Sequence, residues 1–242
     1  MNPQQQPRPA NFDRIARAYR WLEYLSLGPV LEHLRLHHLP QLLHADKRSG
    51  RALILGDGDG RFTARLLSAD LEVEADAVDL SPVMLALLER RCLAASPDAR
   101  ERLRLHHRDA LEFTANSLAA SGYDLVVTHF FLDCLPQAEV EQLVRNVMPL
   151  LTTDALWLVS EFRIPGGILH WPARLYIRML YLAFRLLTGL RTTRLPDHAA
   201  ALHHAGLRNI ATCHMLFGLL TTELWQRPSQ SQATCVPATV SK

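Results

Sequence analysis

Short, nearly continuous apolar runs alternate along the chain with segments whose apolar residues recur at helical spacing. Such runs are typical of parallel strands buried on both faces, and the segments between them are typical of helices that cover those strands. The predicted strands are residues 52–55, VEADAVDLSP up to Asp79, LRLHHRDA up to Asp109, residues 123–131, and ALWLVSEF up to Glu161. With a helix expected over 137–151, the pattern predicts an α/β domain.

The first run ends in the glycine-rich segment GDGDG. Gly56, Gly58 and Gly60 permit a tight turn and the close approach of a ligand to the backbone, and FTARLL then begins a helix. A helix N-terminus at the carboxyl edge of a sheet is where open α/β folds bind nucleotides. The alternative is an ordinary turn between a strand and a helix.

The spacing and charge of this segment differ from a dinucleotide fingerprint. The third glycine comes one residue early and Arg61 stands in its place. Asp57 and Asp59 would repel a pyrophosphate, but they suit a ligand that carries an ammonium or a sulfonium. Asp79 follows about twenty residues later at the end of the second strand, where a carboxylate can bind both hydroxyls of a ribose.

The segments GDGDGRF, VDLSPVML and HHRDALEF together resemble class I S-adenosylmethionine-dependent methyltransferases, over residues 50–226. The resemblance implies a Rossmann-like, doubly wound, seven-stranded sheet with an antiparallel last strand. LRNIATCHM and GLLTTELWQ match the closing antiparallel hairpin of that family. The chain departs from the family at Ile54, where many members carry an acid, and we expect Asp57 and Asp59 to take over part of that role.

The same resemblance implies a set of cofactor contacts. Asp109 would meet the adenine amino group, and Ala110 would supply a backbone amide beside it. Tyr19, in a helical prelude of the form F-D-x-I-A-x-x-Y, would face the cofactor or else pack in the core. The expected S-adenosylmethionine-binding residues are Tyr19, Gly56, Asp57, Gly58, Gly60, Asp79, Leu80, Asp109, Ala110 and Thr128.

The chain divides into one core with additions at both ends. We expect a disordered lead over residues 1–10, a helical cap over 11–45 and the core over 46–226. The core carries a helical insertion over 164–195 after the fifth strand, and a flexible tail follows over 227–242.

Composition narrows the class of partner. A formal net charge of +2 argues against a nucleic-acid binder. The four cysteines are scattered, which fits a reducing cytosol, and the N-terminus does not have the pattern of a signal or transit peptide. We expect a cytoplasmic protein without a metal, because His33, His37 and His38 are better explained as a surface grouping than as a metal site.

The insertion leaves three roles open. It is rich in apolar and aromatic residues, and its arginines at 174, 178 and 185 fall on one helical face. A basic amphipathic helix of this kind can form a lid or pocket for an apolar substrate, lie on an anionic membrane through residues 166–192, or pack on its own domain. The sequence leaves the oligomeric state open.

The chemistry follows from the implied cofactor. A sulfonium methyl is already electrophilic, so the protein must align an acceptor with it and remove the acceptor's proton. His129 and Asp133, near the end of the fourth strand, are the predicted catalytic residues. His170 and His214 are weaker candidates, and a hydrogen bond to Asp133 or to backbone would make His129 structural instead.

The predicted acceptor is a hydroxyl or an activated carbon on a hydrophobic small molecule. Two other classes of function remain. One is a non-catalytic regulatory or partner subunit that binds S-adenosylmethionine, and the other is a nicotinamide-dependent oxidoreductase. The early third glycine and the acids in the loop disfavour the oxidoreductase.

Overall fold

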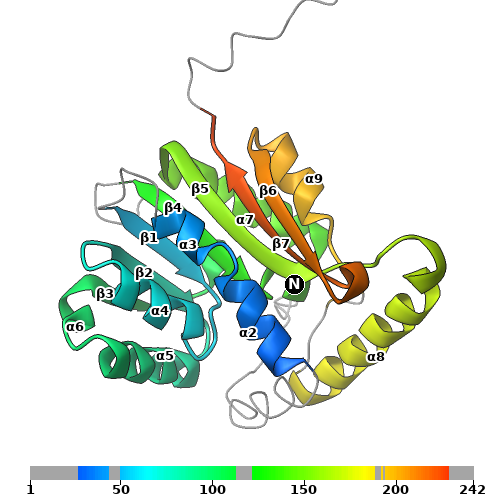
Figure 1. The fold of residues 1–242 in the computed structure, drawn as a ribbon, viewed down its shortest axis with the longest axis horizontal. Coiled ribbons are helices and arrows are strands. Elements are labelled where there is room, and N and C mark those ends of the chain that lie inside the picture. The colour runs from blue at the N-terminus through cyan, green and yellow to red at the C-terminus, as the bar shows by residue number, and fades with distance from the viewer. Residues whose placement is uncertain (1–26, 44–49, 113–121, 189–191, 193, 229–242) are drawn as a thin grey trace, which may run out of the picture.

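A seven-stranded sheet forms the centre of the computed structural model, which describes residues 27–43, 50–112, 122–188, 192 and 194–228 (Figure 1). The strand order is β3-β2-β1-β4-β5-β7-β6. The strands are β1 (Arg51–Leu55), β2 (Glu74–Asp79), β3 (Leu103–His107), β4 (Tyr123–His129), β5 (Leu151–Phe162), β6 (Arg208–Met215) and β7 (Leu220–Gln226). Strands β1 to β5 pair in parallel, whereas β7 is antiparallel to both β5 and β6. The predicted fold class is confirmed.

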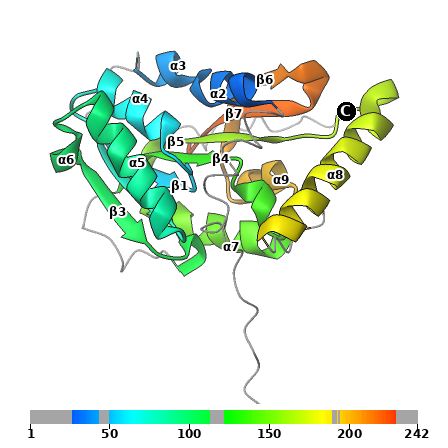
Figure 2. The same cartoon turned by 90° about the horizontal axis from the view of Figure 1, so that it is seen from below.

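Helices cover both faces of this sheet (Figures 1 and 2). One face carries α2 (Gly28–Leu36), α3 (Leu39–Leu43), α4 (Arg61–Ala69), α5 (Pro82–Ala95) and the short α6 (Ala99–Arg102). The other face carries α7 (Gln137–Val147) and α9 (His198–His204). Two apolar clusters fill the space between the sheet and these layers. This arrangement explains why the central strands β1, β4 and β5 contain apolar runs, since both of their faces are buried there. The edge strand β3 is only partly buried.

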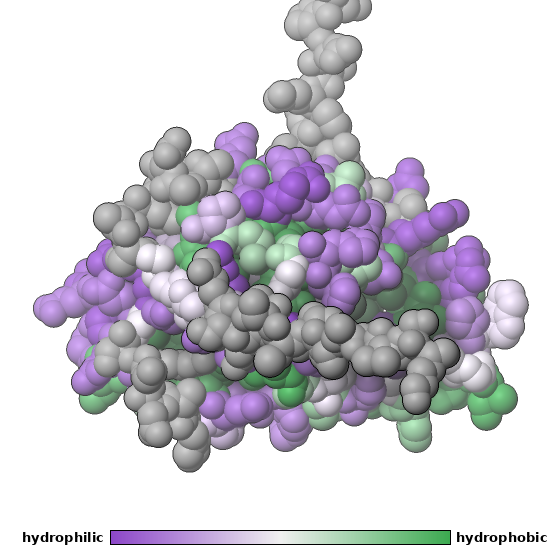
Figure 3. Space-filling model, turned by 90° about the horizontal axis from the view of Figure 1, so that it is seen from above, coloured by the Kyte–Doolittle hydropathy of each residue, from purple (hydrophilic) through white to green (hydrophobic). Residues whose placement is uncertain are grey.

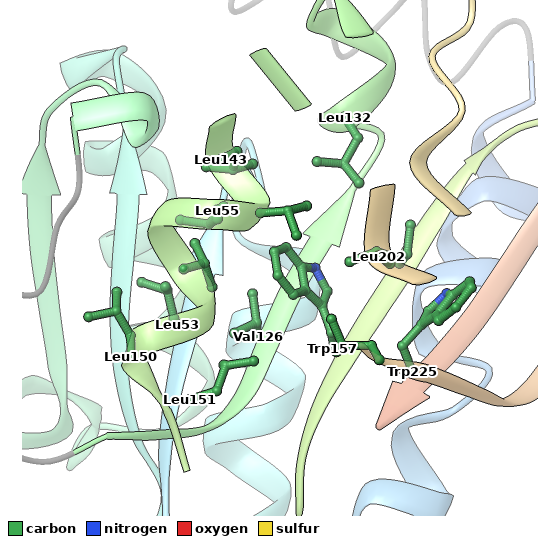
Figure 4. Packing of buried hydrophobic residues seen from close by; sticks show 14 of the residues in the cluster. Leu53, Leu55, Val126, Leu132, Leu143, Leu150, Leu151, Trp157, Leu202 and Trp225 are labelled. Carbon is green, nitrogen blue, oxygen red and sulfur yellow. The ribbon is translucent and has the colours of Figure 1, made fainter. Parts of the chain in front are cut away.

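The larger cluster lies under α7 and α9 and contains two tryptophans (Figure 4). Trp157 of β5 is fully buried and Trp225 of β7 is 5% exposed. Leu143 of α7 and Leu202 of α9 pack with them, and neither is exposed. A core of this size lets the sheet hold its carboxyl edge rigidly, which is the edge where the candidate site forms.

Several strand and helix ends differ from the sequence expectation. Strand β3 ends at His107, so Asp109 lies two residues beyond it. Strand β4 ends at His129 and not at residue 131, because Phe130 has a left-handed backbone with φ +53° and turns the chain out of the sheet. The helix expected over 137–151 ends at Val147, and Pro149 follows in a short 3₁₀ turn.

The N-terminal cap is described only from residue 27 onward, so Tyr19 and the helix expected from residue 11 lie outside the described residues. Helix α2 has Pro29 in its first turn and buries Leu31 and Leu34. These leucines pack against Phe130 and Leu220, so α2 covers the place where the chain leaves β4.

The insertion after β5 forms the 19-residue helix α8 (His170–Thr188). It lies beside the carboxyl edge of the sheet and extends beyond the body of the fold (Figure 2). Ile177 and Tyr181 anchor it, because they pack against Cys134, Phe162 and Leu219. No helix in the described part of the chain combines the length and the apolar character needed to cross a membrane.

Candidate functional site

The glycine loop between β1 and α4 has the backbone that only glycine adopts without strain. Gly56, Gly58 and Gly60 have φ values of +68°, +58° and +79°. Gly60 is the N-cap of α4, and a Cβ there would lie 2.7 Å from the Cα of Leu88 in α5. At Gly58 a Cβ would meet no atom within 4 Å. The loop is therefore tightly packed at Gly60 and has room beside its backbone at Gly58.

Asp57 stabilises the glycine loop by bonding to the start of α4. One of its carboxylate oxygens accepts a hydrogen bond from the Thr63 backbone N–H (2.9 Å) and another from the Thr63 hydroxyl (2.7 Å), which satisfies the first turn of α4. The carboxylate is buried, and this burial raises its pKa although the Thr63 hydrogen bonds act in the opposite direction. Asp57 thus holds the loop to the helix.

Asp59 is held in ion pairs. Its carboxylate lies 2.6 Å from Arg91 Nη2 and 3.2 Å from Arg61 Nε. Arg61 Nη1 also reaches Glu32 of α2 at 3.1 Å. The expectation that the two loop acids face a cationic ligand is therefore wrong for Asp59, whose charge is matched by arginines. The residue in the place of the third fingerprint glycine, Arg61, instead fastens α2 to the loop.

The end of β2 presents Asp79 and Leu80 at the same edge. Asp79 Oδ1 accepts a hydrogen bond from the Ser81 backbone N–H (2.8 Å), which fixes the carboxylate at the strand end. His107 Nε2 donates to the Leu80 carbonyl (3.0 Å), so β3 supports this turn. The Leu80 side chain is 41% exposed, which leaves an apolar surface beside the Asp79 carboxylate.

Asp109 and Ala110 lie just after β3. Asp109 Oδ1 accepts a hydrogen bond from the Leu111 backbone N–H (2.9 Å), in the same local arrangement as at Asp79. Ala110 begins a short 3₁₀ turn and is buried in the larger apolar cluster. Parallel strands β1, β2 and β3 are neighbours in the sheet, so these two acids and the glycine loop follow adjacent strand ends.

Thr128 has its side chain inside the core. Its Oγ1 accepts a hydrogen bond from Trp157 Nε1 (3.1 Å), and the residue has no exposed surface. Neither the side chain nor the backbone of Thr128 is therefore exposed for a contact with the expected cofactor.

His129 is buried on the opposite face, with 2% of its surface exposed. The Phe62 ring lies edge-on to it at a centroid distance of 4.8 Å. Among the described residues neither ring nitrogen has a hydrogen-bond partner, so the bond to Asp133 or to backbone that was the structural alternative for His129 is not formed. Burial, followed by the charges of Arg35 and His38, lowers the pKa of His129 well below its ordinary value. The imidazole is therefore neutral at pH 7.

The turn after β4 is held by a glutamate from the neighbouring strand. Glu161 of β5 accepts hydrogen bonds from the backbone N–H groups of Phe131 (3.1 Å) and Leu132 (2.8 Å). The Phe130 N–H donates to the Ser160 carbonyl (2.7 Å). These bonds offset the left-handed backbone at Phe130 and fix the turn that carries Asp133.

Asp133 and Glu161 form a buried acid pair at the ends of β4 and β5. Burial raises the pKa of Asp133 to about 6, while the neighbouring Cys134 and Glu161 groups act in the opposite direction. Burial and the negative charge of Asp133 raise the pKa of Glu161 well above its ordinary value. Helix α8 contacts the backbone of this pair, because the Tyr181 hydroxyl donates to the Asp133 carbonyl (3.1 Å).

Asp133→Asn is expected to remove part of the pH dependence of stability. Folding raises the pKa of Asp133, so the protonated carboxyl stabilises the folded state. This contribution to the free energy of unfolding is complete below about pH 4 and is lost as the pH rises through about 6. The asparagine variant should therefore gain about 1–3 kcal/mol relative to the parent between pH 4 and pH 7 in urea unfolding. Glu141→Gln, an exposed carboxyl on α7, is the matched control. Equal pH dependence of the parent and the Asp133 variant would contradict this assignment.

Two residues at this edge were missed by the sequence reasoning. Arg35 of α2 is 7% exposed, lies with its guanidinium carbon 5.1 Å from the Phe130 ring centroid, and influences both Asp57 and His129. Its signal was its spacing of four from Leu31, which places it on the buried face of the helix. Glu161 had a signal as well, since it is an acid two residues after the apolar run 155–159 of its strand.

Residues 53–156 match the protein family described as a methyltransferase domain. A search of curated proteins gives no match. The family match, together with the fold, confirms the resemblance to class I methyltransferases that the glycine loop and the acids after β2 and β3 indicate.

Solved structures share this fold at low sequence identity. An O-methyltransferase family protein from Burkholderia thailandensis aligns with a TM-score of 0.65 and 17% identity over 90% of this chain. The pyocyanin biosynthetic protein PhzM aligns at 0.60 and 18% over 90% of this chain. The chain spans 60% of the length of each. The N-methyltransferase NodS from Bradyrhizobium japonicum aligns at 0.54 and 15%, over 82% of this chain and 97% of its own.

Proposed function

We propose that this chain, which carries a methyltransferase domain on a class I fold, transfers a methyl group from S-adenosylmethionine to a hydrophobic small molecule. The observation that carries the proposal is the set of residues that follow three neighbouring strands at one edge of the sheet. A left-handed glycine loop follows β1, and one carboxylate follows each of β2 and β3. Open α/β sheets bind nucleosides at this edge.

The residues present fit the cofactor. The space beside Gly58 allows close approach to backbone N–H groups, and α4 begins at once behind the loop. Asp79 would accept hydrogen bonds from both ribose hydroxyls, and the exposed Leu80 would lie against the adenine. Asp109 would accept from the adenine amino group, with the Ala110 amide beside it. Gly56, Gly60 and Asp57 would act by holding the loop in shape.

When bound, S-adenosylmethionine supplies an electrophilic methyl group. The chain must then hold the acceptor in line and take its proton. Of the two predicted catalytic residues, Asp133 fits this role better, because a pKa of about 6 leaves it ionised at neutral pH and basic enough to accept a proton. The lowered pKa of His129 makes it a weak base, and Phe62 covers its ring.

The acceptor class rests on the surroundings of Asp133. Ile177 and Tyr181 of α8 pack against Cys134, the next residue, and the Tyr181 hydroxyl donates to the Asp133 carbonyl, so an apolar cluster adjoins the group that would take the proton. O- or C-methylation fits a carboxylate that accepts a proton. Several structural neighbours are named as O-methyltransferases and one as an N-methyltransferase. A non-catalytic subunit that binds S-adenosylmethionine is the alternative, and methyl transfer to any acceptor would exclude it.

Asp79→Ala should weaken S-adenosylmethionine binding by about 10- to 100-fold, because paired hydrogen bonds to a charged carboxylate contribute about 1.5–3 kcal/mol. Isothermal titration calorimetry on the parent and the variant measures this change. Asp70→Ala, at the far end of α4, is the matched control and should bind as the parent does. Equal affinity of the parent and the Asp79 variant would remove Asp79 from the site, and weaker binding by the Asp70 variant would show that the effect is not specific.

A further inference from the structure

The charged residues from 162 to 196, between β5 and α9, are all basic. No acidic residue occurs from 162 to 196, whereas six arginines do. Three of these, Arg174, Arg178 and Arg185, lie on α8. The rest of the chain carries a formal net charge of −4, since the whole has +2 and this segment has +6. The positive charge is therefore concentrated on this helix and its flanks.

The outward side of α8 is apolar. Four residues, named here the outer stripe, are unusually exposed for their type: Trp171 (73%), Leu175 (63%), Met179 (59%) and Leu182 (49%). Ile168, in the turn before the helix, is 94% exposed. The inward side is anchored by Ile177 and Tyr181, which are nearly fully buried. The packing of α8 on its own domain thus explains only one of its two apolar sides.

Helix geometry places the three arginines next to the outer stripe. At roughly 100° per residue, Trp171, Leu175, Met179 and Leu182 fall within an arc of about 80°. Arg174, Arg178 and Arg185 fall within about 40° on the border of that arc, between it and the buried side. Arg174 also lies over the Trp171 ring, at 5.9 Å from its centroid.

A second exposed apolar group lies near the start of this segment. Phe217, in the turn between β6 and β7, is 88% exposed and has a left-handed backbone with φ +56°. The Arg163 N–H donates to the Leu219 carbonyl (2.7 Å), which joins this turn to the beginning of the insertion. Phe217 thus adds an exposed apolar side chain on a turn that is hydrogen-bonded to the start of the insertion.

We propose that α8 docks on an anionic lipid surface, with the outer stripe inserted among the acyl chains and the three arginines at the level of the headgroups. An apolar arc bordered by cations, with a tryptophan at the boundary, is the arrangement of helices that lie in the membrane interface. The absence of any acid from 162 to 196 makes the surface complementary to anionic lipid over its whole length.

A second copy of the chain is a poorer occupant. Two copies of α8 packed through their outer stripes would bring arginines from both helices together, with no acid in either segment to balance them. The repulsion would oppose the apolar contact. An anionic lipid surface supplies the missing negative charge.

The test is flotation of the full chain with vesicles of phosphatidylcholine alone and of phosphatidylcholine with about 30% phosphatidylglycerol, at low and high salt. The parent should float with the anionic vesicles only, and high salt should weaken its binding. Trp171→Glu with Leu175→Glu should lower the partition coefficient by about 10-fold or more. Each of Arg174→Gln and Arg178→Gln should lower it by about 5-fold at low salt.

Leu71→Glu is the matched control, because Leu71 is 66% exposed but lies between α4 and β2. It should bind vesicles as the parent does, and all variants should keep the parent's melting temperature and calorimetric cofactor binding. The proposal is overturned if the parent does not float with anionic vesicles, or if the Trp171/Leu175 variant floats as well as the Leu71 variant. It is also overturned if light scattering shows a parent dimer that the Trp171/Leu175 variant loses, since a second copy would then cover the stripe.

Discussion

Gly60→Ala should destabilise the protein by about 2–5 kcal/mol. A left-handed alanine costs about 1–2 kcal/mol, because Gly60 has φ +79°. A Cβ at this position would also lie 2.6 Å from Leu88 Cγ and 2.7 Å from Leu88 Cα, so the backbone of α5 has to move. Overpacking of this kind typically costs a further 1–3 kcal/mol. Urea unfolding of the parent and the variant measures the difference.

Gly58→Ala separates the strain from the clash. Gly58 has φ +58°, but a Cβ there would meet no atom within 4 Å. The variant should therefore lose only the backbone term of about 1–2 kcal/mol. If Gly60→Ala is no more destabilising than Gly58→Ala, the result contradicts the claim that a side chain at position 60 clashes with α5.

Asp133→Asn should lower the single-turnover rate of methyl transfer by about 10²-fold or more, the usual size of general-base assistance. With a radiolabelled methyl group on S-adenosylmethionine and a panel of apolar hydroxyl compounds, the parent's rate should rise with pH and level off above about 7. The reason is that Asp133 is active when ionised and has a pKa of about 6. The variant should lose this rise.

His129→Asn provides the comparison for this profile. If His129 were the base, the parent's rate would be flat from pH 6 to 8, because its pKa lies well below the ordinary value and the imidazole is neutral throughout. We expect instead that the rate of methyl transfer by the His129→Asn variant rises with pH near 6, as the parent's rate does. A flat profile of the parent, together with a 10²-fold loss in the His129 variant, would assign the proton to His129.

The central strands could be predicted from sequence because burial on both faces leaves a local pattern, a short run of apolar residues. Both faces of β1 and β4 are covered, so residues 52–55 and 123–129 read as apolar runs. The glycine loop could be predicted as well, since its positive φ values demand glycine. The Asx-type bonds of Asp79 and Asp109 involve residues only two positions away.

The partners of the charged groups could not be predicted in this way. Asp59 pairs with Arg91, which is 32 residues away, and Arg61 pairs with Glu32, 29 residues away. Both contacts depend on how α2, α4 and α5 pack, which no local pattern reveals. The roles of Glu161 and Asp133 likewise depend on the register of β4 against β5. The loop acids were therefore interpreted as ligand-facing when Asp59 is paired with arginines.

Whether the chain binds S-adenosylmethionine is the most direct question, and calorimetry on the unmodified protein answers it. The glycine loop with Asp79 and Asp109 predicts saturable binding of S-adenosylmethionine and of its demethylated product. NAD should bind far more weakly, because the third glycine of the dinucleotide fingerprint is displaced and Arg61 occupies its place. Absence of a binding heat with both S-adenosylmethionine and its demethylated product, or tighter binding of NAD than of these two compounds, would contradict the proposed cofactor site.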